Sequence, residues 1–186
     1  MLTNNFEAIV AAVENFRDPR ISDRDAFLWE NGIFEIDENG IYKVEFLSLL
    51  NPATARDFPE KVGHVLTLDD NALFDARGQP GFLHYFADEV TLGAARSFCL
   101  WRSAEEAERA SSRGPHQAAV EYTVREGRDV YTFFEIAKSQ MTMTESGLHI
   151  ARLATMTVLN GEFVPPEKRQ KAIDAVWPQH VVSRLA

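Results

Sequence analysis

The sequence predicts an α+β fold, and three patterns carry this prediction. Runs typical of strands occur at 41–50, 80–87, 94–101 and 130–137, and helical periodicity lies between the first two runs and between the last two. Ser103 is followed three residues later by Glu106, a capping box that marks the start of the second helix. The order strand, helix, strand, strand, helix, strand is typical of a ferredoxin-like, four-stranded antiparallel sheet with helices on one face.

The first 40 residues are expected to form an N-terminal extension. Apolar side chains recur at helical spacing over residues 3–17, so we expect an amphipathic helix there. Asn31-Gly32 and Asn39-Gly40 each predict a tight turn, because both residue types accept a positive φ angle at low cost. The second pair would join residues 33–36 to the strand at 41–50 as a hairpin.

The helical segments are expected to be interrupted. Residues 53–75 predict two helical pieces, broken near Pro59 or at Asp69-Asp70. The later helix is expected to break before Pro115 and restart there, because proline is well tolerated in the first turn. The segment REGRD at 125–129 indicates a turn before the last strand of the sheet.

The chain therefore divides into an N-terminal extension (1–40), a central domain (41–138) and a C-terminal extension (139–186). The last segment predicts one or two strands and then a helix from Pro166. One face of a four-stranded sheet would lack helices. The helix at 3–17 and the tail could cover it, but a second subunit is the simpler answer, so we expect a homodimer.

Composition narrows the classes of function. The net charge is -9 and the pI about 5.0, which argues against a nucleic-acid partner, because phosphate contacts need clustered Lys and Arg. A single cysteine, Cys99, forms no intrachain disulfide and indicates a reducing compartment. The sequence has no signal-peptide pattern and no long apolar run, so we expect a cytoplasmic protein without a membrane partner.

Several motifs occur together within residues 41–138. They are a Pro-Gly-Phe turn into the second strand, a tryptophan ending the third strand, a Ser-capped helix, a Pro-His step and an aromatic-rich last strand. Here these are Pro80-Gly81-Phe82, Trp101, Ser103, Pro115-His116 and Tyr131–Ile136. With these motifs the chain resembles the antibiotic-biosynthesis monooxygenases of the dimeric α/β-barrel superfamily, over roughly residues 41–138.

This resemblance implies a cofactor-independent monooxygenase acting on a small apolar or aromatic molecule. In that reaction a base deprotonates an activated substrate, whose carbanion reacts directly with oxygen in a dry pocket. Haem-degrading relatives carry a tryptophan and a histidine where this chain has Ala110 and Val120, so we expect no haem and no other cofactor. The alternatives are a polyketide cyclase or dehydratase in the same pocket, or a non-catalytic small-molecule-binding or stress protein.

Two histidines are candidate catalytic bases. His84 alternates with Phe82 and Phe86, so a regular strand would place all three on one face and bury the imidazole between two rings. His116 lies at a helix start, where the macrodipole favours the neutral ring. We rank His84 first because it is expected to be the more buried of the two. The alternative is a structural role for both.

Substrate-binding candidates are aromatic or amide side chains near strand ends: Asn51, Phe82, Phe86, Trp101 and Tyr131. The aromatic residues could equally belong to the core, and Asn51 could be a turn residue. The five histidines show no H-x-H or H-x-x-x-H pair, and the acidic runs lack EF-hand spacing, so we predict no metal site. Cys99 is expected to be an inert core residue.

Overall fold

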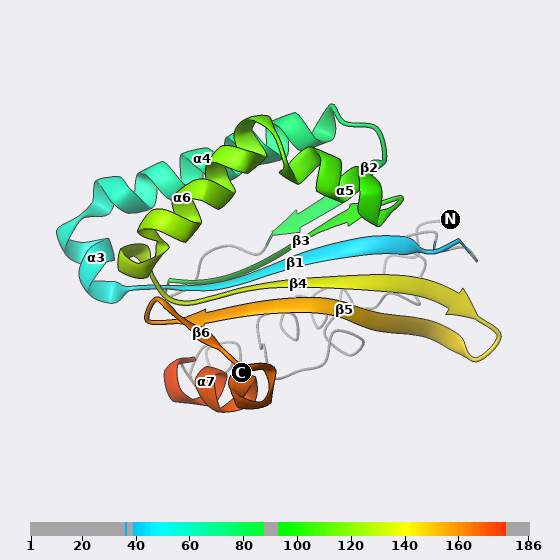
Figure 1. Ribbon diagram of the computed structural model, residues 1–186. Coiled ribbons are helices and arrows are strands. Elements are labelled where there is room, and N and C mark those ends of the chain that lie inside the picture. Colours follow the sequence, from blue (N-terminus) through cyan, green and yellow to red (C-terminus); the bar gives the residue numbers. More distant parts are fainter. Residues whose placement is uncertain (1–35, 37–38, 88–92, 178–186) are drawn as a thin grey trace, which may run out of the picture.

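The computed structural model describes residue 36, residues 39–87 and residues 93–177. Within them the chain forms one six-stranded antiparallel sheet in the order β2-β3-β1-β4-β5-β6 (Figure 1). The strands are β1 (Ile41–Leu50), β2 (Phe82–Ala87), β3 (Ala94–Trp101), β4 (Tyr131–Thr144), β5 (Gly147–Leu159) and β6 (Glu162–Val164).

The predicted α+β class is confirmed, but the predicted number of strands is wrong. The first four strands have the neighbour order of a ferredoxin-like sheet, with β1 between β3 and β4. The chain then continues through β4 to Thr144, turns at Gly147 with a φ of 103°, and returns as β5 beside β4. The strands expected in the C-terminal extension therefore lengthen the same sheet from four strands to six.

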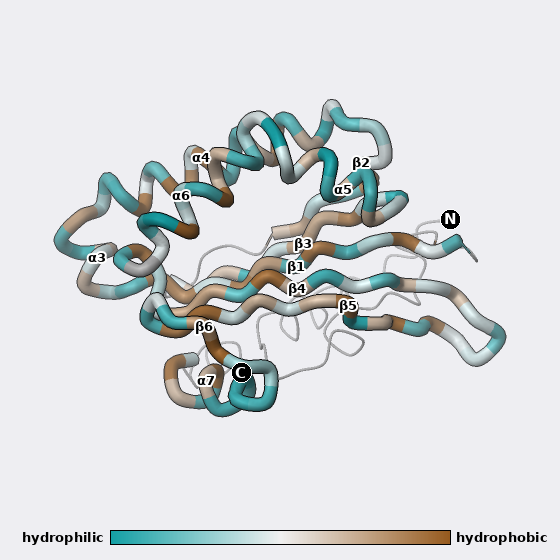
Figure 2. The backbone as a smooth tube through the Cα atoms, viewed as in Figure 1, coloured by the Kyte–Doolittle hydropathy of each residue, from teal (hydrophilic) through white to brown (hydrophobic). Residues whose placement is uncertain are grey.

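Helices lie on both sides of the sheet. Figure 1 shows α4 and α6 side by side over one face, with α3 and α5 at their ends, whereas α7 lies on the opposite face. Figure 2 shows hydrophilic residues spread along these helices and hydrophobic stretches within β1, β3 and β4. The helical segments are α3 (Pro52–Asp57), α4 (Pro59–Arg77), α5 (Ala104–Ser111), α6 (Gly114–Val130), the 3-10 turn η2 (Pro166–Lys168) and α7 (Arg169–Val176).

The helix breaks follow the prolines and not the acidic pair. The first helical segment is interrupted at Phe58, immediately before Pro59, and α4 is continuous through Asp69 and Asp70. The break predicted near Pro59 is confirmed, and the alternative at the acidic pair is not observed. Adjacent aspartates are weak helix formers, but they cost far less than a proline in a helix interior.

The turn predicted at 125–129 is wrong, because α6 continues to Val130 and passes directly into β4. The end of α6 is fixed by the connection that follows β1. The backbone N–H of Asn51 donates to the carbonyl of Val130 at 2.8 Å, and the Thr54 hydroxyl donates to the carbonyl of Asp129. These distant donors satisfy terminal carbonyls that a helix leaves unpaired.

The predicted capping box is present and also explains the turn into β2. The backbone N–H of Glu106 donates to Ser103 Oγ at 3.2 Å, and this hydroxyl lies 3.3 Å from Glu106 Oε2. Gly81 has a φ of 80°, and a Cβ atom there would lie 2.0 Å from the Glu106 carboxylate. A glycine is therefore required by both the backbone angle and the space.

The face of the sheet opposite α4 and α6 is buried and carries charged side chains among its apolar ones. Lys43 is 1% exposed, Glu45 5% and Arg96 4%. Both cations reach the same carboxylate, since Lys43 Nζ lies 2.7 Å from Glu45 Oε2 and Arg96 Nε lies 2.6 Å from Oε1. Such pairing offsets the high cost of removing charges from water.

A second ionic group connects α7 to this face. Arg169 donates to both carboxylate oxygens of Glu135, at 2.6 and 2.7 Å, and the Thr157 hydroxyl donates at 2.7 Å. Ile173 and Trp177 pack beside it against Leu47, Leu49 and Phe133. The C-terminal helix is thus held by a bidentate ion pair and an apolar cluster.

These contacts remove the basis on which a homodimer was predicted. The face is largely apolar, as expected, and also carries charged residues, but its side chains are buried within a single chain and are not left uncovered. The premise is wrong because strand periodicity identifies two faces without showing what covers each one. The homodimer and the division at residues 40 and 138 stay predictions.

The expected helix at 3–17, the first Asn-Gly turn and most of the hairpin arm at 33–36 lie outside the described residues. Among the helices that the structure describes, none combines the length and the hydropathy needed to cross a bilayer.

Candidate active site between the helices and the sheet

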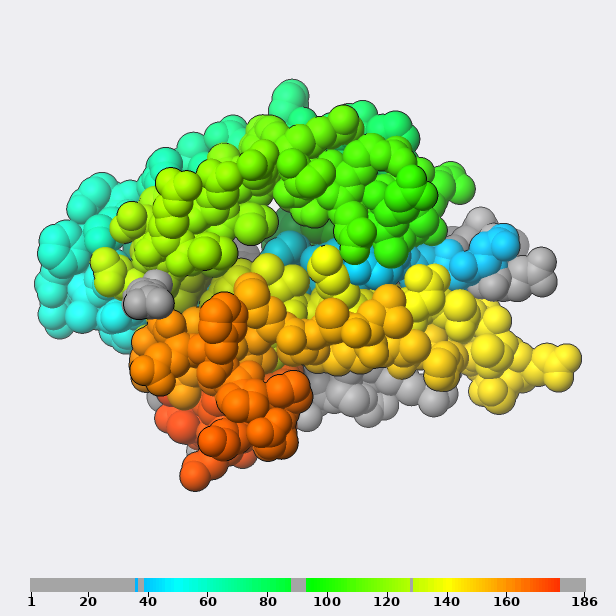
Figure 3. Space-filling model, viewed as in Figure 1, coloured from blue at the N-terminus to red at the C-terminus, as the bar shows by residue number. Residues whose placement is uncertain are grey.

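The helical layer and the sheet are separated by a recess. Along β1 and β4 the side chains that face away from α4 and α6 are buried, whereas most of those facing these helices, beyond the buried Tyr42, are only partly buried. Figure 3 shows a hollow between the helices and the sheet. The accessible, helix-facing side chains include Val44, Phe46, Phe134 and Ile136. The recess therefore has a largely apolar floor.

Tyr85 and Asp69 meet across this recess. Tyr85 lies on β2 and faces the helices, and its hydroxyl donates to Asp69 Oδ2 at 3.1 Å. Asp69 comes from the side of α4 that also carries the buried Ala72 and Ala76. Its carboxylate is crowded by protein atoms yet stays accessible to solvent. This pair is the polar centre of the candidate site.

The surroundings shift the acidities of both groups. Burial raises the pKa of Asp69, as does the neighbouring Asp70, whereas the Tyr85 hydrogen bond and His116 act in the opposite direction. Burial also raises the pKa of Tyr85, and the negative charge of Asp69 adds to this. The phenol is therefore a hydrogen-bond donor at neutral pH.

His116 approaches the same region from the first turn of α6. Its side chain is 15% exposed, and Nδ1 lies 4.0 Å from Asp75 Oδ2. Nδ1 is buried and has no hydrogen-bond partner. Burial lowers the pKa of His116, while Asp75 and Asp69 oppose this shift. The imidazole is therefore neutral at pH 7 and can accept a proton.

Tyr131 completes the aromatic lining, as the sequence suggested. It lies at the start of β4, and its ring centroid is 5.3 Å from that of Phe134. Burial raises the pKa of Tyr131, with smaller contributions from Asp69 and Tyr122. The recess thus brings together a neutral imidazole, a carboxyl with raised pKa, phenol donors and aromatic surface. These groups can remove a proton from a bound molecule and stabilise the oxyanion that results.

The structure reverses the expected burial of the two histidines. β2 contains a bulge between Phe82 and His84. Phe82 pairs with Trp101 and His84 pairs with the adjacent residue Leu100, so β2 has one more residue than β3 at this point. Adjacent positions on β3 face opposite sides, so this bulge separates Phe82 from His84. The prediction of one shared face is wrong. His84 is exposed, with its pKa lowered by burial of part of the ring and by Arg77.

The other predicted binding residues are dispersed. Phe82 packs edge-on against Trp101 at 5.3 Å on the helix side, where Trp101 is 2% exposed in the core beneath α5. Phe86 stacks on Phe98 at 5.5 Å on the opposite face of the sheet. Asn51 caps α3, where its Oδ1 accepts from the backbone N–H groups of the next turn. Only Tyr131 and His116 lie with the Asp69 group.

Sequence reasoning missed Asp69, Tyr85 and Asp75. One signal was present, because Asp69 falls on the same helical stripe as Ala72 and Ala76, and an acidic residue on an inward stripe is unusual. Tyr85 could not be found from the alternation, because the bulge turns it toward the helices. A regular strand would place its neighbours His84 and Phe86 on that face.

Cys99 and the acidic runs add no further chemistry to the site. Cys99 is 6% exposed, and burial raises the pKa of its thiol to about 12, so it remains a thiol. In the part of the chain that the structure describes, no cluster of three or more His, Cys, Asp or Glu side chains could hold a metal ion.

Comparison with known proteins gives structural similarities only. No protein-family model and no curated protein matches the sequence. SnoaB from Streptomyces nogalater, a cofactor-independent oxygenase, has a TM-score of 0.36 and 14% identity, over 61% of this chain and 94% of that chain. A Chloroflexus aurantiacus protein described as an antibiotic biosynthesis monooxygenase has a TM-score of 0.35 and 15% identity, over 64% and 91%.

A third structure, PA3566 from Pseudomonas aeruginosa, has a TM-score of 0.40 and 14% identity, over 53% of this chain and 91% of that chain. The predicted resemblance is thus confirmed as a similarity to solved structures that include antibiotic biosynthesis monooxygenase-like proteins. Similarity of this size carries no conclusion about the reaction, which has to be inferred from the site itself.

Proposed function

We propose that the recess binds a small apolar or aromatic molecule and that the chain is a cofactor-independent monooxygenase. The observation that carries this proposal is the hydrogen-bonded pair of Tyr85 and Asp69 above a largely apolar floor, with His116 near enough for its charge and that of Asp69 to interact. A neutral imidazole can take a proton, and the Tyr131 phenol, which burial keeps protonated, can donate to the developing oxyanion. The apolar surroundings strengthen both interactions because they exclude water.

The substrate class is an aromatic ketone or phenol with an acidic CH2 group. His116 removes one proton, and the charge moves to the substrate oxygen, where Tyr131, a phenol that burial keeps protonated, donates a hydrogen bond. The carbanion then reacts with O2, and the CH2 group becomes a carbonyl. One oxygen atom enters the product and the other leaves as water with both hydrogens, so the substrate supplies all the electrons.

The direct test is oxygen consumption by the purified chain with a panel of such compounds. We expect uptake of one O2 per product molecule and, with 18O2, one labelled oxygen in the product. A product formed equally fast without oxygen, with unchanged mass or the loss of water, would instead identify a cyclase or dehydratase. Saturable binding without any product would identify a binding protein.

Two histidine variants separate the candidate bases. His116→Gln should lower kcat by about 100-fold or more, the usual contribution of a general base. His84→Gln should stay within about threefold of wild type, because His84 is exposed and lies across the bulge from Phe82. His64→Gln is a further control, since His64 packs edge-on against Tyr122 at 4.7 Å. A larger loss in His84→Gln would contradict the assignment.

A further inference from the structure

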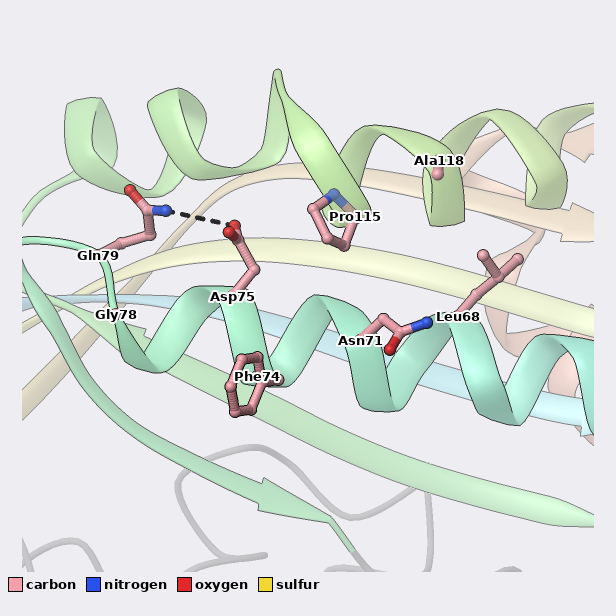
Figure 4. A pocket seen from close by; sticks show the side chains of 8 residues that line it. All are labelled: Leu68, Asn71, Phe74, Asp75, Gly78, Gln79, Pro115 and Ala118. Carbon is pink, nitrogen blue, oxygen red and sulfur yellow. Dashed lines mark hydrogen bonds between the residues drawn. The ribbon is translucent and has the colours of Figure 1, made fainter.

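The Asp75 carboxylate lies beside His116 and is held there by a hydrogen bond of its own. Gln79 Nε2 donates to Asp75 Oδ2 at 3.3 Å (Figure 4), and Arg113 in turn donates to Gln79 Oε1. The last turn of α4, the loop after it and the residue before α6 thus contribute to one chain of polar contacts. This chain fixes the carboxylate opposite the buried His116 Nδ1, at 4.0 Å.

A groove on the outer side of α4 and α6 keeps Asp75 in contact with water. The groove has a volume of about 640 Å³, and its lining includes Asp75, Gln79, Asn71 and Pro115 (Figure 4). The Asp75 side chain is 28% exposed, whereas that of His116 is 15% exposed. Contact with water in the groove spares this carboxylate the desolvation cost of a fully buried polar group.

We propose that Asp75 is a positioning residue for His116. Its carboxylate holds the ring with Nδ1–H toward the groove and leaves Nε2, on the other side of the imidazole, free to take the proton. The charge of Asp75 also stabilises the imidazolium that forms. This inference rests on the proposed role of His116 as the base, but its test needs no substrate.

The charged side chains near the His116 imidazole differ in where they lie and in which partners they already have. Asp75 faces it from the α6 side of α4, and Asp69 acts on it from the side of α4 that faces the sheet. Tyr85 hydrogen-bonds to Asp69, so part of that charge is already engaged. Arg113 is directed to Gln79. Asp75 is therefore the carboxylate with which Nδ1 can pair.

The first test is the tautomer of neutral His116 in the wild-type chain. Nitrogen chemical shifts from 15N NMR, assigned with His116→Gln, should show the proton on Nδ1, because the hydrogen bond made by one nitrogen selects the tautomer. A proton on Nε2 would overturn the proposal. This measurement uses the unaltered protein, so it does not depend on a variant that folds.

The second test compares Asp75→Asn with Asp70→Asn, which removes the same charge from an exposed position of α4. A titration from about pH 5 to pH 8 should show the His116 pKa lowered by about one unit in Asp75→Asn. The shift in Asp70→Asn should be about 0.2 units or less, because an exposed charge is screened. Equal shifts in the two variants would contradict a specific role for Asp75.

Activity gives an independent readout. If the oxygenase is confirmed, Asp75→Asn should lower kcat about tenfold or more at an unchanged KM and move the acidic limb of the pH profile to lower pH. An unchanged profile would refute the positioning role. The expected tautomer and pKa shift in a chain without oxygenase activity would support the pairing and refute only the proposed function.

Discussion

The Tyr85 hydroxyl lies 3.1 Å from Asp69 Oδ2 and joins the edge strand β2 to the middle of α4 across the recess. The two residues are 16 positions apart, and they meet because α4 runs back over the sheet before β2 begins. A hydrogen bond at the polar centre of an otherwise apolar recess can orient a ligand as well as stabilise the fold.

Tyr85→Phe should raise the pKa of Asp69 further, because the hydrogen bond from Tyr85 lowers it. The free energy of unfolding should fall by about 0.5–1.5 kcal/mol, the usual net value of one hydrogen bond. Carboxyl 13C titration and urea unfolding would measure the two effects. Tyr122→Phe is the matched control, since Tyr122 packs on His64 through its ring. An equal pKa change in both variants would contradict the pairing.

His116 should make the folded state less stable in mild acid. Its folded-state pKa lies below the ordinary value of 6.5, so the unfolded chain binds the proton more tightly. This contribution to stability is complete above about pH 6.5 and is lost as the pH falls through the folded-state pKa. Thermal unfolding should show the loss in wild type and a smaller one in His116→Gln. Parallel curves for the two proteins would refute this prediction.

Asp69 should have the opposite effect to His116 on how the stability of the folded chain depends on pH. Its folded-state pKa lies above 3.8, so the folded chain binds the proton more tightly over that interval. Stability is therefore lost as the pH rises from about 3.8 through the raised pKa. Asp69→Asn should abolish this loss and be more stable than wild type at neutral pH. Urea unfolding at several pH values would measure it, and a less stable variant would contradict the prediction.

Glu135→Ala should lower the free energy of unfolding by about 3–5 kcal/mol, because it leaves Arg169 without its bidentate partner and the Thr157 hydroxyl without an acceptor. The ends of α7 should also lose hydrogen-exchange protection. Glu167→Ala is a control, since Glu167 is an exposed carboxylate in η2. Similar losses in both variants would show that the network does not hold α7.

Two glycine substitutions should have opposite signs. Gly81→Ala should destabilise the chain by about 1 kcal/mol or more, since φ is 80° and the new Cβ would meet the Glu106 carboxylate. Gly63→Ala should stabilise it by about 0.5–1 kcal/mol, because Gly63 lies within α4 with no atom within 4 Å of a new Cβ. Equilibrium unfolding measures both, and equal signs would contradict the expectation.

Local signals in the sequence determined much of the fold. The bounds of β1 and β3, the break before Pro59, the Ser103 capping box and the glycine turn at Gly81 each depend on residues within a few positions of one another. Their energies come from backbone preferences and short-range hydrogen bonds, which the residue types specify directly. The same signals also gave the order of the first four strands and two helical regions.

The tertiary structure alone decided the candidate site. The bulge in β2 places one extra residue between Phe82 and His84. The alternation of Phe82, His84 and Phe86 in the sequence does not indicate this bulge. His116 is more buried than His84 because α6 packs against α4, which places Asp75 Oδ2 4.0 Å from the imidazole Nδ1. Contacts between residues far apart in the chain depend on register and on how helices cross the sheet. The spacing of residues in the sequence determines neither the register nor the helix crossing. The sequence therefore identified the two candidate histidines, and only the packing showed which of them is the more buried.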